Sequence, residues 1–110
     1  MHGSEPVVKQ CVEIITSAKS QEERLEAANI LIALIEILPY NILTSLQEIS
    51  GVALSIDERD IAKNEAFAFV GAEPTMLMQV ERWKRSPELF AFGTGVERAL
   101  TLSIEERTGA

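Results

Sequence analysis

Apolar residues recur at intervals of three and four along almost the whole of this chain. In an α-helix, with about 3.6 residues per turn, this spacing gathers the apolar side chains on one face. No run alternates apolar and polar residues between hairpin turns, as a half-buried strand would. The pattern predicts an all-α fold of five to six helices. The apolar segments run over residues 5–18, 21–38, 39–53, 56–70, from 74 to the proline at 87, and 96–107, with one helical turn over 88–92.

Proline and glycine mark where these segments begin or end. Pro6 lies in the first turn of the first segment, where a missing N–H is tolerated. Pro39 ends the second segment, because proline cannot continue a helix without losing a hydrogen bond. Gly71 is expected to stop the fourth segment. Gly93 and Gly95 favour a flexible link before the last helix.

A helix-start signal recurs in the sequence. The pattern Ser/Thr-x-x-Glu-Arg begins at Ser20, Ser55 and Thr94, at separations of 35 and 39 residues. In such a capping box the hydroxyl accepts from the backbone N–H three residues on, and the Glu side chain accepts from the N–H of the cap residue. The same pattern at Ser103 falls inside the last segment, where it caps nothing. The recurrence predicts about three helical hairpins, arranged either as a right-handed stack or as a compact bundle.

The period near 34 residues resembles that of the tetratricopeptide repeat (TPR). With the terminal proline of that repeat placed on Pro39, Ala27 falls on the small position of its second helix. With the proline placed on Pro74, Ala62 and Ser50 fall on the small positions of the two helices. The resemblance covers the first two units, implies stacked helical hairpins and carries over no functional residues. The third unit has too long a loop, and three positions of the first two depart from the family pattern: Ile15, Ala18 and Ala53.

The composition is that of one small, acidic domain. The chain has 110 residues, of which 46% are apolar, and its 17 acidic and 10 basic residues give a net charge of −7. This length suits a single core. We expect a single helical domain over residues 5–107, a cloning remnant or disordered start over 1–4, and a disordered tail over 108–110.

The same composition excludes several classes of partner. Phosphate binding needs clustered Lys and Arg, so we expect no nucleic-acid partner. The longest apolar run, residues 30–35, is too short to span a bilayer, and no signal peptide is visible. We therefore expect no membrane partner and a cytoplasmic location. With one cysteine and one histidine, we expect no disulfide, no metal site and no cofactor.

The sequence offers no arrangement that suggests catalysis, so we expect no catalytic residues and no enzyme activity. His2 lies in the presumed cloning remnant and cannot serve as a buried general base. Cys11 lies on the inward stripe of the first helix, where a cysteine is more often a small hydrophobe than a nucleophile. Asp57, Glu58 and Asp60 lack the spacing of a calcium loop, and acids in a first turn suit the positive end of the helix dipole.

The second segment is apolar on almost every side, which is typical of a helix that is central in the fold or pressed against a partner. Residues 82–87 form the one basic island of the chain. This island contains Trp and Arg, two residue types that are enriched at interface hot spots. Trp83 also continues the apolar stripe of Met76 and Val80, which favours a place in the core. The candidate partner-binding residues are Leu34, Ile35, Ile37, Leu38, Arg82 and Trp83.

These features predict a small acidic binding module, an adaptor or chaperone, which covers an amphipathic helix of a partner protein in a groove. Two alternatives remain open. The surplus apolar surface could be buried in a homodimer with a structural role. Asp57, Glu58 and Asp60 could instead plug the basic site of a target, as in an inhibitor or immunity protein.

The charge is unevenly spread along the chain. Residues 1–38 hold three basic and six acidic residues, and residues 39–73 hold two and six, whereas residues 74–110 hold five of each. An acidic front two-thirds could steer a basic partner toward one side of the molecule. Equally, the surplus acid could serve only to maintain solubility.

Overall fold

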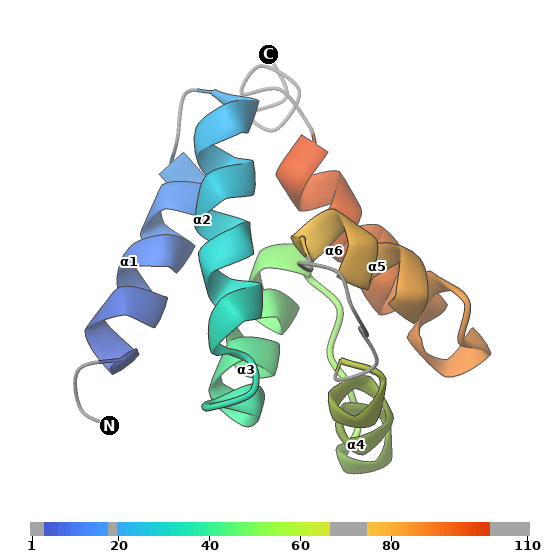
Figure 1. Cartoon of the computed structure of the whole chain (residues 1–110). Coiled ribbons are helices and arrows are strands. Elements are labelled where there is room, and N and C mark those ends of the chain that lie inside the picture. The colour runs from blue at the N-terminus through green and yellow to red at the C-terminus, as the bar shows by residue number, and fades with distance from the viewer. Residues whose placement is uncertain (1–3, 18–19, 67–74, 102–110) are drawn as a thin grey trace.

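The apolar segments form α-helices in the computed structural model of the chain, which describes residues 4–17, 20–66 and 75–101 (Figure 1). The predicted all-α fold is confirmed, since these residues form six α-helices, one 3-10 turn and no strand. The expected ends of the fourth and sixth segments, and the termini over 1–3 and 108–110, lie outside the described residues. The elements are α1 (Ser4–Ser17), α2 (Gln21–Leu34), α3 (Pro39–Ser50), α4 (Ile56–Glu65), α5 (Met76–Lys84), η1 (Pro87–Leu89) and α6 (Phe90–Thr101).

The helices are arranged around α6, which packs on both α5 and α3 and also contacts α2. Helices α1 and α2 lie side by side and antiparallel on one side of the molecule, and α5 and α6 lie on the other (Figure 1). Helix α3 packs more extensively on α6 than on α4. The radius of gyration is 13.2 Å, close to the roughly 13 Å of a compact domain of this length. The described helices therefore form a compact globule.

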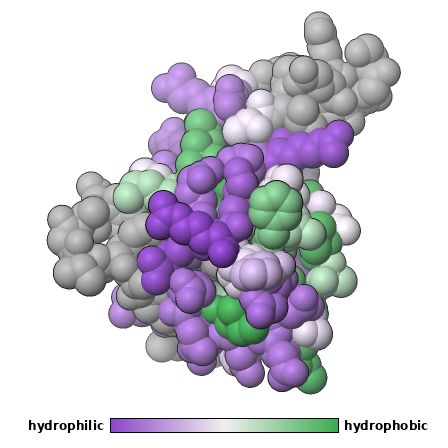
Figure 2. Space-filling model, turned by 90° about the vertical axis from the view of Figure 1, so that its right-hand side faces the viewer, coloured by the Kyte–Doolittle hydropathy of each residue, from purple (hydrophilic) through white to green (hydrophobic). Residues whose placement is uncertain are grey.

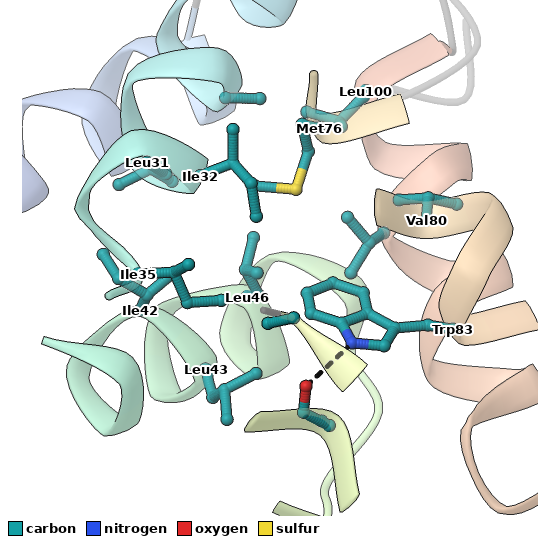
Figure 3. Packing of buried hydrophobic residues seen from close by; sticks show 14 of the residues in the cluster. Leu31, Ile32, Ile35, Ile42, Leu43, Leu46, Met76, Val80, Trp83 and Leu100 are labelled. Carbon is teal, nitrogen blue, oxygen red and sulfur yellow. Dashed lines mark hydrogen bonds between the residues drawn. The ribbon is translucent and has the colours of Figure 1, made fainter. Parts of the chain in front are cut away.

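An apolar core fills the space where the helices meet, and all six contribute buried side chains to it. Figure 3 shows its centre, where Leu46 of α3 and Trp83 and Met76 of α5 point toward one another. All three side chains are fully buried. Burying one large apolar side chain stabilises a fold by about 1.5–3 kcal/mol, so these three side chains make a large contribution to the stability.

The second helix ends four residues earlier than its periodicity predicts. Helix α2 stops at Leu34, and residues 35–38 form a turn. The ring of a proline disfavours the helical conformation of the residue before it, and Leu38, which precedes Pro39, has φ −130° and ψ 58°. The amides of Ile37 and Leu38 both donate to the Leu34 carbonyl at 3.0 Å, which closes α2. Pro39 then opens α3 in the first turn, where its missing N–H is tolerated.

The predicted start signal is present at two of its three positions. Ser55 forms the full capping box: its Oγ accepts from the Glu58 amide at 3.2 Å, and the Glu58 carboxylate accepts from the Ser55 amide at 2.8 Å. At Ser20 the hydroxyl accepts from the Glu23 amide at 3.2 Å. Thr94 caps nothing, because it lies inside α6. The third start signal was therefore wrong.

The expected flexible link before the last helix is also wrong. Helix α6 begins at Phe90 and runs through Gly93 and Gly95. The contacts of α6 with its neighbours explain why glycine occupies these two positions. A Cβ on Gly93 would lie 2.9 Å from Cγ and 3.2 Å from the backbone N of Lys84 in α5. A Cβ on Gly95 would lie 2.9 Å from Cβ and 3.1 Å from the backbone O of Ser50 in α3. The glycines therefore let the α6 backbone approach α5 and α3 closely, and they do not break the helix.

Because Thr94 lies within α6, its replacement by alanine is expected to raise the free energy of unfolding by up to about 1 kcal/mol. Within the described part of the chain its buried Oγ1 has no hydrogen-bond partner, and alanine has the higher helix propensity. Urea denaturation measures the change. Ser55→Ala is the comparison, because it removes a functioning cap and is expected to cost about 1 kcal/mol. A loss for Thr94→Ala as large as that for Ser55→Ala would contradict the helix start at Phe90.

Gly95→Ala is expected to lower the free energy of unfolding by about 1–2 kcal/mol, because overpacking outweighs the gain in helix propensity. The new methyl group would meet the backbone of Ser50, which cannot rotate away. Gly93→Ala should cost less, since its nearest atom is Cγ of Lys84 and its backbone contacts, at 3.2 Å and 3.3 Å, are longer than the 3.1 Å contact at Gly95. Thermal and urea denaturation of the two variants would test this order, and a more stable Gly95→Ala protein would contradict the close contact of α6 with α3.

Candidate functional site

The six predicted partner-binding residues do not form one surface. Ile35 and Trp83 have 3% and 0% of their surface exposed and lie in the core (Figure 3). Neither side chain offers surface to a partner in this fold, so both predictions are corrected, and the core alternative for Trp83 is confirmed. The other four lie in two places, with Leu34, Ile37 and Leu38 at the end of α2 and Arg82 on α5.

The basic island on α5 joins α5 to its neighbours. Nε1 of Trp83 donates to the Ala62 carbonyl at 3.1 Å, and the Trp83 ring centroid lies 5.1 Å from that of Phe92. Nε of Arg82 donates to the Glu65 carbonyl at 2.8 Å and lies 3.0 Å from the Glu65 carboxylate. Both residues therefore hold the last turns of α4 against α5, which explains their sequence pattern without a partner.

The surface on the α5 and α6 side of the molecule offers little apolar area for docking. Figure 2 shows this face as mostly hydrophilic, with hydrophobic residues in separate small patches. Specific docking sites are usually contiguous apolar patches rimmed by polar groups. On the other side of the molecule, α1 and α2 expose the large apolar residues Val7 and Ile30.

A groove runs between α1 and α2, and we call it the α1–α2 groove. It has a volume of about 300 Å³ and is lined by Ile14 of α1 and by Glu23, Glu26, Ala27 and Ile30 of α2. Ala27 is buried, Ile14 is half-buried and Ile30 has 42% of its surface exposed. The aliphatic side chains thus extend from the floor of the groove to its rim, where the exposed carboxylates lie beside them.

Helical geometry extends the apolar surface of the groove beyond these residues. Leu34 lies four residues after Ile30 on α2, and Val7 lies two turns before Ile14 on α1, so each shares a face with a groove residue. Val7 has 37% of its surface exposed, and Ile37, in the turn after α2, has 51%. Of the predicted contact residues, Leu34 therefore shares the face of α2 that borders the groove.

A second groove, the α1–α3 groove, lies on the other side of α1 and has a volume of about 360 Å³. Most of its lining is polar, and it carries charges of both signs. Such groups must find new hydrogen-bond partners when they are covered, which makes this groove less suitable for an apolar anchor. It is lined by Glu5, Val8, Lys9, Val12, Asn41, Thr44, Ser45 and Glu48.

The acidic cluster at the start of α4 is partly engaged within the protein. Glu58 belongs to the capping box of Ser55. The Tyr40 hydroxyl donates to the Asp60 carboxylate at 2.7 Å, and this hydrogen bond raises the pKa of Tyr40. Nζ of Lys63 lies 5.2 Å from the centre of the Tyr40 ring. Two of the three carboxylates therefore stabilise α4 and its contact with α3.

Cys11 is buried in the core, with 2% of its surface exposed, and burial raises the pKa of its thiol. The folded protein therefore favours the unreactive thiol over the thiolate. At pH 8 we expect a thiol reagent to modify the native protein at least about tenfold more slowly than the urea-unfolded protein. Absorbance of the released thiol dye gives both rates, and equal rates would contradict the burial of this side chain.

Comparisons with protein-family models, with curated proteins and with solved structures gave no match. The tetratricopeptide resemblance therefore stays a prediction. Among the described helices, none is long and apolar enough to cross a membrane. Over residues 4–17, 20–66 and 75–101, no three His, Cys, Asp or Glu side chains lie together in a way that could hold a metal ion.

Ile30 and Ile14 were not among the predicted contact residues, although the sequence carried a signal for Ile30. Ile30, Leu31 and Ile32 are consecutive, and successive helical residues point about 100° apart. Three such residues cannot all face one core, and Ile30 is the one turned outward. Glu23 and Glu26 carried no comparable signal, because their position beside α1 depends on how the two helices pair.

Proposed function

We propose that this protein is a small binding module, an adaptor or chaperone, which covers an amphipathic helix of a partner protein in the α1–α2 groove. The observation that carries the proposal is the composition of this groove: aliphatic side chains on its floor and carboxylates on its rim. An amphipathic helix has the complementary surface, with apolar anchors along one face and polar residues on either side. Cytoplasmic location and the lack of enzymatic activity remain predictions.

The length of the groove suits a short helix. The α2 residues that share its face extend from Glu23 to Leu34, which at 1.5 Å per residue is about 16 Å, or three helical turns. A partner helix of that length presents anchors at positions i, i+3, i+4 and i+7. The side chains available to receive them are Ile14 and Ile30, which line the groove, and Val7 and Leu34, which share their helix faces.

The two alternative functions find weaker support. The plug formed by Asp57, Glu58 and Asp60 loses two of its three carboxylates to contacts within the protein. A second copy of the chain could cover the α1–α2 groove, but a two-fold axis parallel to the groove would bring Glu23 and Glu26 of one copy against the same carboxylates of the other. Like charges brought together in this way cost free energy.

Ile30→Gln is expected to weaken partner binding about tenfold, because it removes an apolar anchor of roughly 1–2 kcal/mol. The probes are peptides selected from a library of helical sequences for binding to the wild-type protein, and fluorescence anisotropy gives each Kd. The matched control is Ile56→Gln: Ile56 has 80% of its surface exposed and lies on α4, outside the groove. Circular dichroism verifies that both variants stay folded.

Three results would overturn the proposal. Selected peptides could lack an amphipathic helical pattern, or their binding could be equally sensitive to Ile56→Gln and to Ile30→Gln. Sedimentation could also show a concentration-dependent dimer that Ile30→Gln dissociates, which would assign the groove to a second copy of the chain.

A further inference from the structure

We infer that the helix that occupies the α1–α2 groove is basic, with Lys or Arg residues beside its aliphatic anchors. This inference rests on the function proposed above and adds the charge of the partner. Of the five residues that line the groove, two are carboxylates, Glu23 and Glu26, and the other three are aliphatic. Both carboxylates are exposed and therefore available to a partner.

The spacing of the two carboxylates favours a cation between them. Glu23 and Glu26 are three residues apart on α2, where side chains are neighbours on the helix surface. Like charges at this spacing repel each other, and the repulsion is relieved when a positive group approaches both. An ammonium or guanidinium group on a partner helix can do this while its apolar residues enter the groove.

The helix ends near the carboxylates do not offset their charge. Helix α1 ends at Ser17 and α2 begins at Gln21, so a negative helix end and a positive one lie at the same end of the pair. Their partial charges are of similar size and opposite sign. Helix α1 also has no basic residue in its last turn. Glu23 and Glu26 are therefore the charged side chains that line the groove, and the net charge of −7 adds a negative potential at longer range.

The effect of this charge on affinity should be moderate and dependent on salt. Exposed ion pairs contribute little individually, so two of them correspond to about tenfold in Kd at low ionic strength. Screening shortens the range of such pairs to about 10 Å at 0.1 M salt and to about 3 Å at 1 M. The aliphatic contacts are not screened in this way. Salt should therefore weaken the charge preference and leave apolar binding in place.

Two synthetic peptides test the inference. Each is a helix of about 14 residues, or four turns, with leucine at positions i, i+3, i+4 and i+7. One has Lys at the flanking positions and the other has Glu. Fluorescence anisotropy at low salt should give a Kd about tenfold lower for the Lys peptide. In the variant Glu23→Lys/Glu26→Lys this preference should reverse.

The control variant Glu13→Lys/Glu48→Lys changes the net charge by the same amount at two exposed residues that do not line the α1–α2 groove. It should keep the preference for the Lys peptide. If this control reverses the preference as well, the effect belongs to net charge and the inference is overturned. If both peptides bind equally at all salt concentrations, the groove function stands and only the inference about charge is overturned. If neither peptide binds, the proposed function itself is overturned.

Discussion

The arrangement of this fold depends on how closely the α6 backbone approaches α3 and α5. Gly93 and Gly95 provide the space, because a Cβ at either position would meet atoms of the facing helix within 3 Å. A Cβ at either position would push α6 away from its neighbours, and the shift would spread, because protein interiors are packed as densely as organic crystals. With α6 in place, Leu100 lies fully buried, and its carbonyl accepts from Nε of Arg24 at 3.5 Å. That contact joins α2 to the last turn of α6, where a cation is electrostatically favourable.

Much of the fold was predictable because the helices and their buried faces follow from local sequence. The spacing of Val8, Cys11 and Ile15 on α1 indicates both a helix and its inward side, and all three are buried. The errors lie where a contact between distant residues decides the outcome. Gly93 and Thr94 have the sequence of a helix break followed by a start, but the helix continues through them because α6 packs closely on α5 and α3.

The candidate site was predictable only in part, and the reason is again tertiary. The apolar excess of the second segment correctly indicated exposed aliphatic surface, since Ile30 and Ile37 remain outside the core. Which of its residues face outward depends on where the core lies, and Ile35 faces inward. The acidic rim depends further on the pairing of α1 with α2. Trp83 was ambiguous because a residue suited to an interface is equally suited to a core, as its contact with Ala62 demonstrates.

Helix α1 has a geometry that connects the two grooves. Val8, Cys11 and Ile15 attach it to the core by a narrow stripe, while Ile14 borders one groove and Val12 the other. Helix α1 therefore forms one side of each groove, and its distance from α2 and from α3 determines the width of the two grooves. Any displacement of α1 toward α2 narrows one groove and widens the other. A substitution that changed the position of α1 would therefore alter the shape of both grooves together.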